Sequence, residues 1–134
     1  MAREVNNSKP EWVTRKIVEA VSNTRTKFKR EIVIACLGLA FKANIDDLRE
    51  SPSLEIVERL ADKNWESRLL VVEPYVDELP PELAAKKSVY LVDMHIALAE
   101  ADVIVLLVDH VQFKSVDVTA LKGKTVIDTR GAWR

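Results

Sequence analysis

The sequence predicts an α/β fold: a Rossmann-like three-layer domain with a mostly parallel sheet, preceded by an N-terminal helix. Short apolar segments alternate with stretches of helical periodicity, and this alternation favours parallel strands joined by right-handed crossovers. The segment Ile32–Leu37 is apolar at every position, which is typical of a strand covered by helices on both faces. A chain of 134 residues is long enough for one such domain.

The first expected element is a helix from Pro10 to about Lys27. Ser8 precedes Pro10 and Glu11 in an arrangement that resembles a capping box. The apolar side chains then recur at helical spacing. They are Trp12, Val13, Ile17, Val18 and Val21.

The rest of the chain alternates strands with helices and loops, which supports the parallel sheet. After the strand Ile32–Leu37 we expect, in order, a loop to Glu50, a helix from Pro52 to about Lys63, a strand Leu69–Val72, a loop Tyr75–Lys87 with one helical turn, a strand Val89–Val92, a helix Met94–Glu100, a strand Val103–Val108, short helical turns within Phe113–Leu121, and a strand Thr125–Asp128.

Composition and charge exclude several classes of function. A formal net charge of −1 argues against a general nucleic-acid or membrane binder, which needs a basic face. No apolar run approaches the roughly 18–20 residues that cross a bilayer. A single cysteine permits no internal disulfide, so we expect a cytoplasmic protein. Two histidines and one cysteine, far apart in sequence, do not predict a metal site.

The loop between Gly38 and Pro52 is the strongest candidate for a ligand site. It follows a buried strand, where open α/β sheets bind their ligands, and it carries the cations Lys42 and Arg49. It ends at Ser51-Pro52, a helix start whose free N–H groups favour anions. Arg130 follows the last strand at the same edge and could join Lys42 on one polyphosphate. The alternative is that these cations are ordinary surface residues.

Other residues carry weaker signals. Gly38 is the only glycine in the first strand-to-helix turn, whereas a dinucleotide site needs three, so a full NAD site in this domain is not expected. Cys36 lies inside an apolar run and is expected to be a buried structural residue rather than a nucleophile. His95 is expected to be exposed at a helix start. A supporting role for His110, which follows a strand at the ligand-facing edge, stays open.

Several segments resemble one protein family. Gly38–Lys42 and Asp47–Pro52 resemble the signature of the C-terminal nucleotide-sugar-binding domain of the UDP-glucose/GDP-mannose dehydrogenase family. Four more segments resemble its UDP-N-acetyl-D-mannosamine dehydrogenase branch: Val71–Pro74, Ala101–Val103, Val108–Lys114 and Asp128–Arg134. The residues before Pro10 resemble the end of the central helical region of that family. The resemblance covers essentially the whole chain.

The resemblance implies specific roles for residues. Family enzymes oxidise the C6 alcohol of a nucleotide sugar to a carboxylate in two hydride transfers to NAD. By this resemblance Phe41 and Lys42 contact the UDP-sugar, as does Arg130, and Arg49 reaches NAD bound on another domain. Residues 1–29 would be the end of the central helical region, and residues 30–134 the UDP-sugar-binding domain.

The chain lacks other parts of the family pattern. The glycine-flanked motif with the catalytic cysteine, the assisting lysine and asparagine, and the NAD fingerprint are all missing. We therefore expect no catalytic residue here, no NAD bound stably by this chain alone, and the C-terminal part of a longer enzyme, which the resemblance implies is a homodimer with its NAD and central domains. Two alternatives stay open. One is an assembly module, with the apolar stripe of the first helix (Trp12, Ile17) exposed. The other is a domain for another nucleotide sugar, such as UDP-glucose or GDP-mannose.

Overall fold

The computed structural model describes residues 10–28, 31–40, 51–63, 67–129 and 133. Within these residues the chain forms one five-stranded sheet in the order β3-β2-β1-β4-β5, and every strand pair is parallel. The strands are β1 (Ile32–Leu37), β2 (Ser67–Val72), β3 (Val89–Leu91), β4 (Val103–Leu106) and β5 (Thr125–Asp128). The predicted α/β fold class with a parallel sheet is confirmed.

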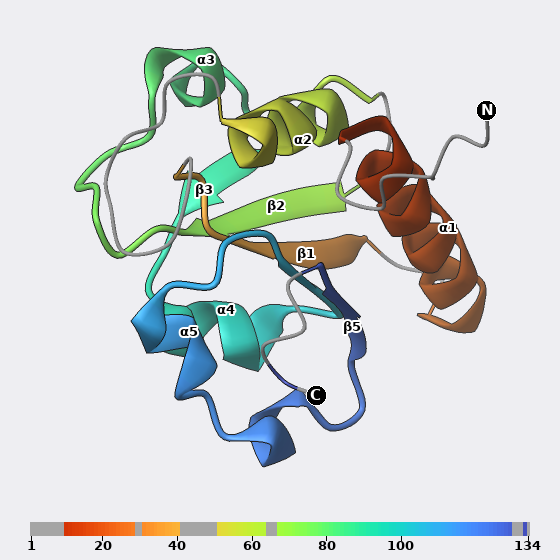
Figure 1. The fold of residues 1–134 in the computed structure, drawn as a ribbon. Helices are drawn as coiled ribbons and strands as arrows, with labels where there is room; N and C mark the ends of the chain where they lie inside the picture. Colours follow the sequence, from red (N-terminus) through yellow and green to blue (C-terminus); the bar gives the residue numbers. More distant parts are fainter. Residues whose placement is uncertain (1–9, 29–30, 41–50, 64–66, 130–132, 134) are drawn as a thin grey trace, which may run out of the picture.

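Helices cover the sheet on both faces (Figure 1). The helices α1 (Pro10–Phe28) and α2 (Pro52–Ala61) lie on one face, and α4 (Met94–Glu100) and α5 (Val111–Lys114) lie on the other. The short helix α3 (Pro81–Ala84) precedes β3, and a 3-10 turn, η1 (Val118–Leu121), precedes β5. The three layers are therefore helix, sheet and helix.

The central strand β1 explains why the two faces need covering. All six of its side chains are buried. Ile32, Ile34 and Cys36 pack with α1 and α2, whereas Ala35 and Leu37 pack with Ala97 of α4 and with Phe113 of α5. Because successive side chains of a strand point to opposite faces, an unbroken apolar run fills two cores at once.

Helix α1 belongs to the same folded layer as α2. Val13, Ile17 and Val21 are at most 1% exposed and lie in the core cluster on that face of the sheet, with Trp12 packed partly buried against it. The expectation that this apolar stripe is exposed is therefore wrong, since α1 lies against α2 and the sheet of its own chain.

The remaining boundaries agree with the sequence prediction to within a few residues. Strand β4 is shorter than predicted, because the chain turns after Leu106: the N–H groups of Leu107 and Val108 both donate to the carbonyl oxygen of Leu37. Across the described helices, none is long and apolar enough to cross a membrane.

Candidate functional site

The carboxyl ends of the strands bring the candidate residues to one edge of the sheet. Leu37, the last residue of β1, pairs with Val72 on one side and with Leu106 on the other, and Leu106 in turn pairs with Asp128. Four strands therefore end side by side. In open α/β sheets this edge is where ligands bind.

The chain leaves β1 through a tight turn at Gly38. Its φ of +106° lies in a region that residues with a side chain rarely adopt. A Cβ atom placed there would lie 2.6 Å from the Cβ of Val108. The N–H of Gly38 donates to the carbonyl oxygen of Val72 at 2.9 Å. Only glycine fits this position, since a side chain would collide with the segment that follows β4.

The carboxylate of Glu73 holds the residues after Gly38. Its Oε2 atom accepts the N–H groups of Leu39 at 2.8 Å and of Ala40 at 3.1 Å, and its Oε1 atom accepts the N–H of Tyr75 at 3.1 Å. The Nε2 atom of His110 lies 2.9 Å from Oε2. One side chain therefore joins the segments that follow β1, β2 and β4.

The Glu73–His110 pair is fully buried, and both side chains are 0% exposed. Burial on its own raises the pKa of the Glu73 carboxyl, but the hydrogen bonds from His110, Leu39 and Tyr75 outweigh it, so the net shift of the pKa is downward. Aromatic rings enclose the imidazole: Tyr75 lies 4.7 Å and Phe113 5.4 Å from it, between ring centroids. Glu73 is thus a buried carboxylate whose partners favour its charged form.

Ser51 fixes the start of α2 to the same turn. Its hydroxyl donates to the carbonyl oxygen of Leu39 at 2.6 Å, with that of Ala40 at 3.2 Å, and accepts the N–H of Leu54 at 3.2 Å as the N-cap of α2. The expectation that this helix start offers free N–H groups to an anion is therefore wrong for Leu54. We call Gly38, Leu39, Ala40, Ser51 and Glu73 the first anchor.

A second group of contacts lies after β5. The Thr129 hydroxyl donates to the carbonyl oxygen of Leu106 at 2.6 Å, and the Thr129 N–H donates to the same oxygen at 3.2 Å. The Asp128 carboxylate accepts the N–H of Trp133 at 3.0 Å, and the Trp133 indole N–H donates to the carbonyl oxygen of Phe113 at 2.8 Å. We call Asp128, Thr129 and Trp133 the second anchor.

The predicted contact residues themselves lie outside the described residues. Phe41, Lys42 and Arg49 fall within 41–50, directly between the two halves of the first anchor, and Arg130 falls within 130–132, between Thr129 and Trp133 of the second. The structure brings the flanks of both segments to one sheet edge, with β4 between β1 and β5. The roles of these four residues stay predictions.

Two other sequence expectations can be compared with the structure. Cys36 is 0% exposed in β1, and burial raises the pKa of its thiol to about 12, so it is a poor nucleophile, as predicted. His95 is exposed, also as predicted. In the part of the chain with described side chains, no group of three His, Cys, Asp or Glu residues could hold a metal ion.

Sequence reasoning missed the role of Glu73, which appeared only within the segment Val71–Pro74 of the family resemblance. A charged residue directly after an apolar strand, at the ligand-facing edge, is the signal that could have identified it. His110 also follows a strand at this edge, four residues after the end of β4, and its supporting role was left open. Their separation of 37 residues explains why sequence spacing did not pair them.

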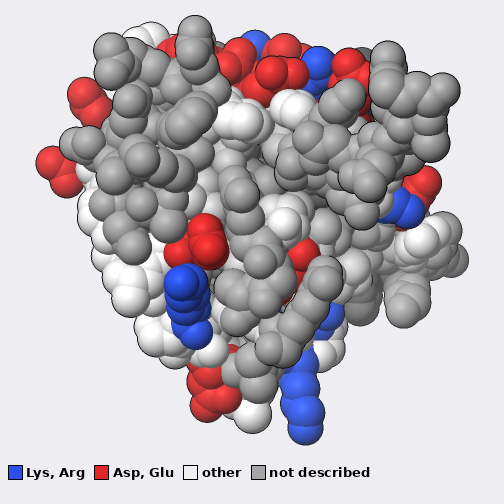
Figure 2. All heavy atoms as spheres, in the orientation of Figure 1, with Lys and Arg blue, Asp and Glu red and all other residues white. Residues whose placement is uncertain are grey.

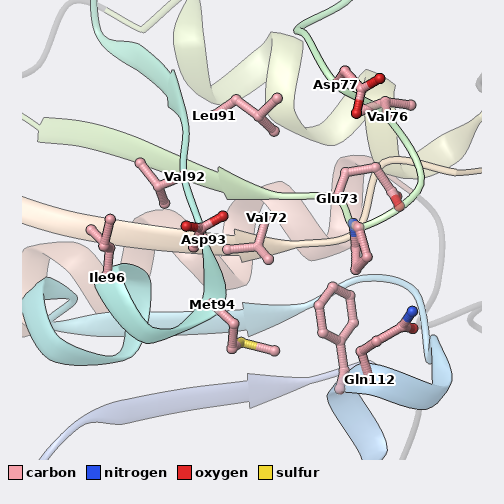
Figure 3. Close-up of a pocket in the computed structure, with 12 residues that line it drawn as sticks. Val72, Glu73, Val76, Asp77, Leu91, Val92, Asp93, Met94, Ile96 and Gln112 are labelled. Carbon is pink, nitrogen blue, oxygen red and sulfur yellow. The ribbon is translucent and has the colours of Figure 1, made fainter.

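A hollow of about 640 Å³ lies beside the first anchor. Figure 3 shows its residues converging from the segment after β2 (Glu73, Asp77), the start of α4 (Asp93, Met94) and α5 (Gln112). Asp77 and Asp93 are exposed, and the described lining includes no lysine or arginine. Among the described lining residues, the charged side chains are therefore carboxylates, which do not favour an anionic ligand.

Charges on the visible surface are mixed. In the view of Figure 2 the described lysine, arginine, aspartate and glutamate side chains are interspersed around the rim of the molecule. This distribution agrees with the formal net charge of −1. On this face the described charges form no broad basic surface.

Comparisons with known proteins match the segments that form both anchors. Residues 35–134 match the family model described as UDP-glucose/GDP-mannose dehydrogenase family, UDP binding domain. The chain is 49% identical over 132 residues to an NDP-N-acetyl-D-galactosaminuronic acid dehydrogenase of Ralstonia nicotianae, covering 98% of this chain and 29% of that protein. It is 47% identical over 137 residues to a UDP-N-acetyl-D-mannosamine dehydrogenase of Escherichia coli, covering 99% and 32%.

A solved structure agrees with these relatives. A UDP-glucose dehydrogenase from Pyrobaculum islandicum superposes with a TM-score of 0.68 at 28% sequence identity, covering 92% of this chain and 27% of that one. The chain therefore spans about three-tenths of the length of the relatives that it matches.

Proposed function

We propose, from the premise that the chain belongs to the UDP-glucose/GDP-mannose dehydrogenase family and contains its UDP binding domain, that it binds the UDP moiety of a nucleotide sugar at the carboxyl edge of its sheet. The observation that carries the proposal is that the family match runs through both anchors, from residue 35 to residue 134. The first anchor holds the chain on both sides of residues 41–50, and the second holds it on both sides of residues 130–132.

The residues proposed to contact the ligand follow from this arrangement. Lys42 and Arg130 would bind the two phosphates with charge-assisted hydrogen bonds, and Phe41 would contact the nucleotide sugar beside Lys42. Arg49 would reach towards NAD held by another part of the enzyme. A diphosphate bound between the ends of β1 and β5 would lie where the strand order reverses, at the switch point of the sheet.

NAD itself does not fit the described turn. A dinucleotide pyrophosphate binds the backbone N–H groups of the first strand-to-helix turn, but here those of Leu39 and Ala40 already donate to Glu73. We therefore propose that NAD is bound mainly by a separate domain of a longer enzyme, and that this chain contributes no catalytic residue. The longer enzyme would be a cytoplasmic homodimer with its central and NAD domains.

The sugar proposed is N-acetyl-D-mannosamine, which the longer enzyme would oxidise at C6 to a carboxylate. A relative at 47% identity carries that name. Another relative is named for N-acetyl-D-galactosaminuronic acid, and the similar solved structure is named for UDP-glucose. Another nucleotide sugar is therefore the second candidate. The assembly-module hypothesis lost its supporting feature when the stripe of α1 proved to be buried.

Calorimetric titration of the purified chain with UDP tests the proposal. UDP should bind with measurable heat, UMP should bind more weakly because it lacks one phosphate, and GDP should compete poorly. Absence of UDP binding at millimolar concentration would contradict the proposed function. GDP binding as tight as UDP binding would contradict only the choice of nucleotide.

A further inference from the structure

Glu73 occupies a position that is unusual for a carboxylate. The two successive N–H groups of Leu39 and Ala40 form a concave donor site directly after a buried parallel strand. In nucleotide-binding α/β proteins such donors face the ligand's phosphate. Here they face Oε2 of the chain's own Glu73, at 2.8 and 3.1 Å.

Both oxygens of the Glu73 carboxylate have hydrogen-bond partners within the protein. Besides the two turn N–H groups it accepts the N–H of Tyr75 and lies 2.9 Å from Nε2 of His110. A buried charge is costly unless it is paired and hydrogen-bonded, and each of these partners reduces that cost. A ligand phosphate therefore has no vacant donor at Leu39 or Ala40.

The geometry of the turn follows from these contacts. Leu39 and Ala40 are held at their N–H groups by Glu73 and at their carbonyl oxygens by Ser51. Both residues are 0% exposed. The direction in which the chain leaves the sheet after Ala40 therefore depends on Glu73, which is itself fixed by His110 from the segment after β4.

We propose that Glu73 is a positioning residue for the UDP site: its carboxylate takes the place of a ligand phosphate in the turn after β1, and so fixes the direction in which the chain leaves the sheet after Ala40. This inference rests on the proposed function. It means that the N–H groups of Leu39 and Ala40 are not available to the diphosphate, because Glu73 of the protein itself occupies them.

The decisive variant is Glu73→Gln, since two explanations predict opposite changes in its affinity for UDP. If Glu73 acted only as a negative charge near an anionic ligand, its neutralisation would tighten UDP binding. As a positioning residue its change should weaken UDP binding at least about tenfold, because an amide cannot accept from three N–H groups and His110 as a carboxylate does. Calorimetry on the folded variant measures the dissociation constant.

A matched control separates charge from position. Glu78→Gln makes the same chemical change on an exposed side chain five positions later, and should leave the UDP dissociation constant within about twofold of the wild type. Urea unfolding of both variants shows whether the binding was measured on folded protein. A purely structural role would lower the urea midpoint of Glu73→Gln and leave its dissociation constant unchanged, and that result would overturn the proposal.

Amide hydrogen exchange tests the positioning without any ligand. The N–H groups of Leu39 and Ala40 should be protected in the wild type and should lose protection in Glu73→Gln, whereas the amides within β5 should keep theirs. Unchanged exchange at Leu39 and Ala40 would contradict the inference. If the wild-type chain does not bind UDP, the proposed function fails, while the exchange result still decides whether Glu73 fixes the turn.

A second variant covers the case in which Glu73→Gln does not fold. His110→Leu keeps the Glu73 charge and the apolar contacts with Tyr75 and Phe113, but removes the imidazole that lies against Oε2. We expect an intermediate loss of UDP affinity, about threefold to tenfold. Wild-type affinity in a folded His110→Leu protein would overturn the claim that His110 helps to fix Glu73.

Discussion

The two anchors serve similar segments but are built differently. The first anchor lies in the interior: Leu39 and Ala40 are fully buried, Ser51 and Glu73 nearly so, and its hydrogen bonds join the ends of three central strands. The second anchor lies at the edge strand β5, and its three residues are only half-buried. The segments that carry the proposed phosphate contacts Lys42 and Arg130 are therefore held by one buried support and one half-buried support.

The largest expected effect concerns Cys36, two residues before Gly38 of the first anchor. Because burial raises the pKa of its thiol to about 12, alkylation by iodoacetamide at pH 8 should be about 10³-fold slower in the folded chain than in urea, since only the thiolate reacts. Mass spectrometry follows the reaction at the only cysteine. Comparable rates in the two states would show that the core beneath the first anchor is open.

The next largest effect is expected for Gly38→Ala. The new Cβ would lie 2.6 Å from that of Val108 at a φ of +106°, so the free energy of unfolding should fall by about 2–5 kcal/mol. Gly123→Ala is the matched control, because Gly123 also has a positive φ, of +79°, but among the described residues no atom beyond its two chain neighbours lies within 4 Å of the added Cβ.

The control should lose only about 1–2 kcal/mol, the cost of backbone strain alone. Urea denaturation of both variants gives the comparison. Equal losses would show that the close approach of Val108 to Gly38 contributes nothing, and that the first anchor is less tightly packed than its geometry indicates.

Lys42→Ala and Arg130→Ala compare the two ligand contacts that the anchors support. Each should weaken UDP binding by about 1.5–3 kcal/mol if it removes a charge-assisted hydrogen bond to phosphate. Lys87→Ala, at an exposed site before the amino end of β3, is the control and should leave the affinity unchanged. Calorimetry that finds wild-type affinity in both test variants would contradict their assignment to the phosphates.

The smallest expected effects compare single hydroxyl groups in the two anchors. Ser51→Ala removes the N-cap of α2 and the hydrogen bond to Leu39, and should lower the free energy of unfolding by about 1–2 kcal/mol. Thr129→Val removes one hydrogen bond to Leu106 and should cost about 0.5–1 kcal/mol. A larger loss for Thr129→Val, measured by urea denaturation, would reverse the ranking of the anchors.

How far the sequence alone predicted this molecule depends on the range of the interactions involved. Strands and helices were predicted from local periodicity: Thr125–Asp128 and Met94–Glu100 agree with the structure residue for residue. The burial of Cys36 followed from its apolar neighbours. Local patterns carry this information because periodicity determines which side chains face a core.

Contacts across the sheet could not be predicted in the same way. Glu73 pairs with groups 33, 34 and 37 residues away, and only the strand order places them together. The packing of α1 was also wrong in the sequence interpretation, since an apolar stripe does not indicate which surface covers it. Ser51 was predicted as a helix start, but its bond to a carbonyl 12 residues earlier was not.

The bond between Ser51 and Leu39 has a consequence for changes of length between these two residues. Because the hydroxyl of one holds the carbonyl of the other at 2.6 Å, the chain enters and leaves residues 41–50 at nearly the same point. The length of such a segment can change at little cost in stability. Doubling it raises the entropic cost of loop closure by only about 0.6 kcal/mol. If residues 41–50 contact the ligand as proposed, replacing the segment between Ala40 and Ser51 would change those contacts while the sheet beneath keeps its sequence.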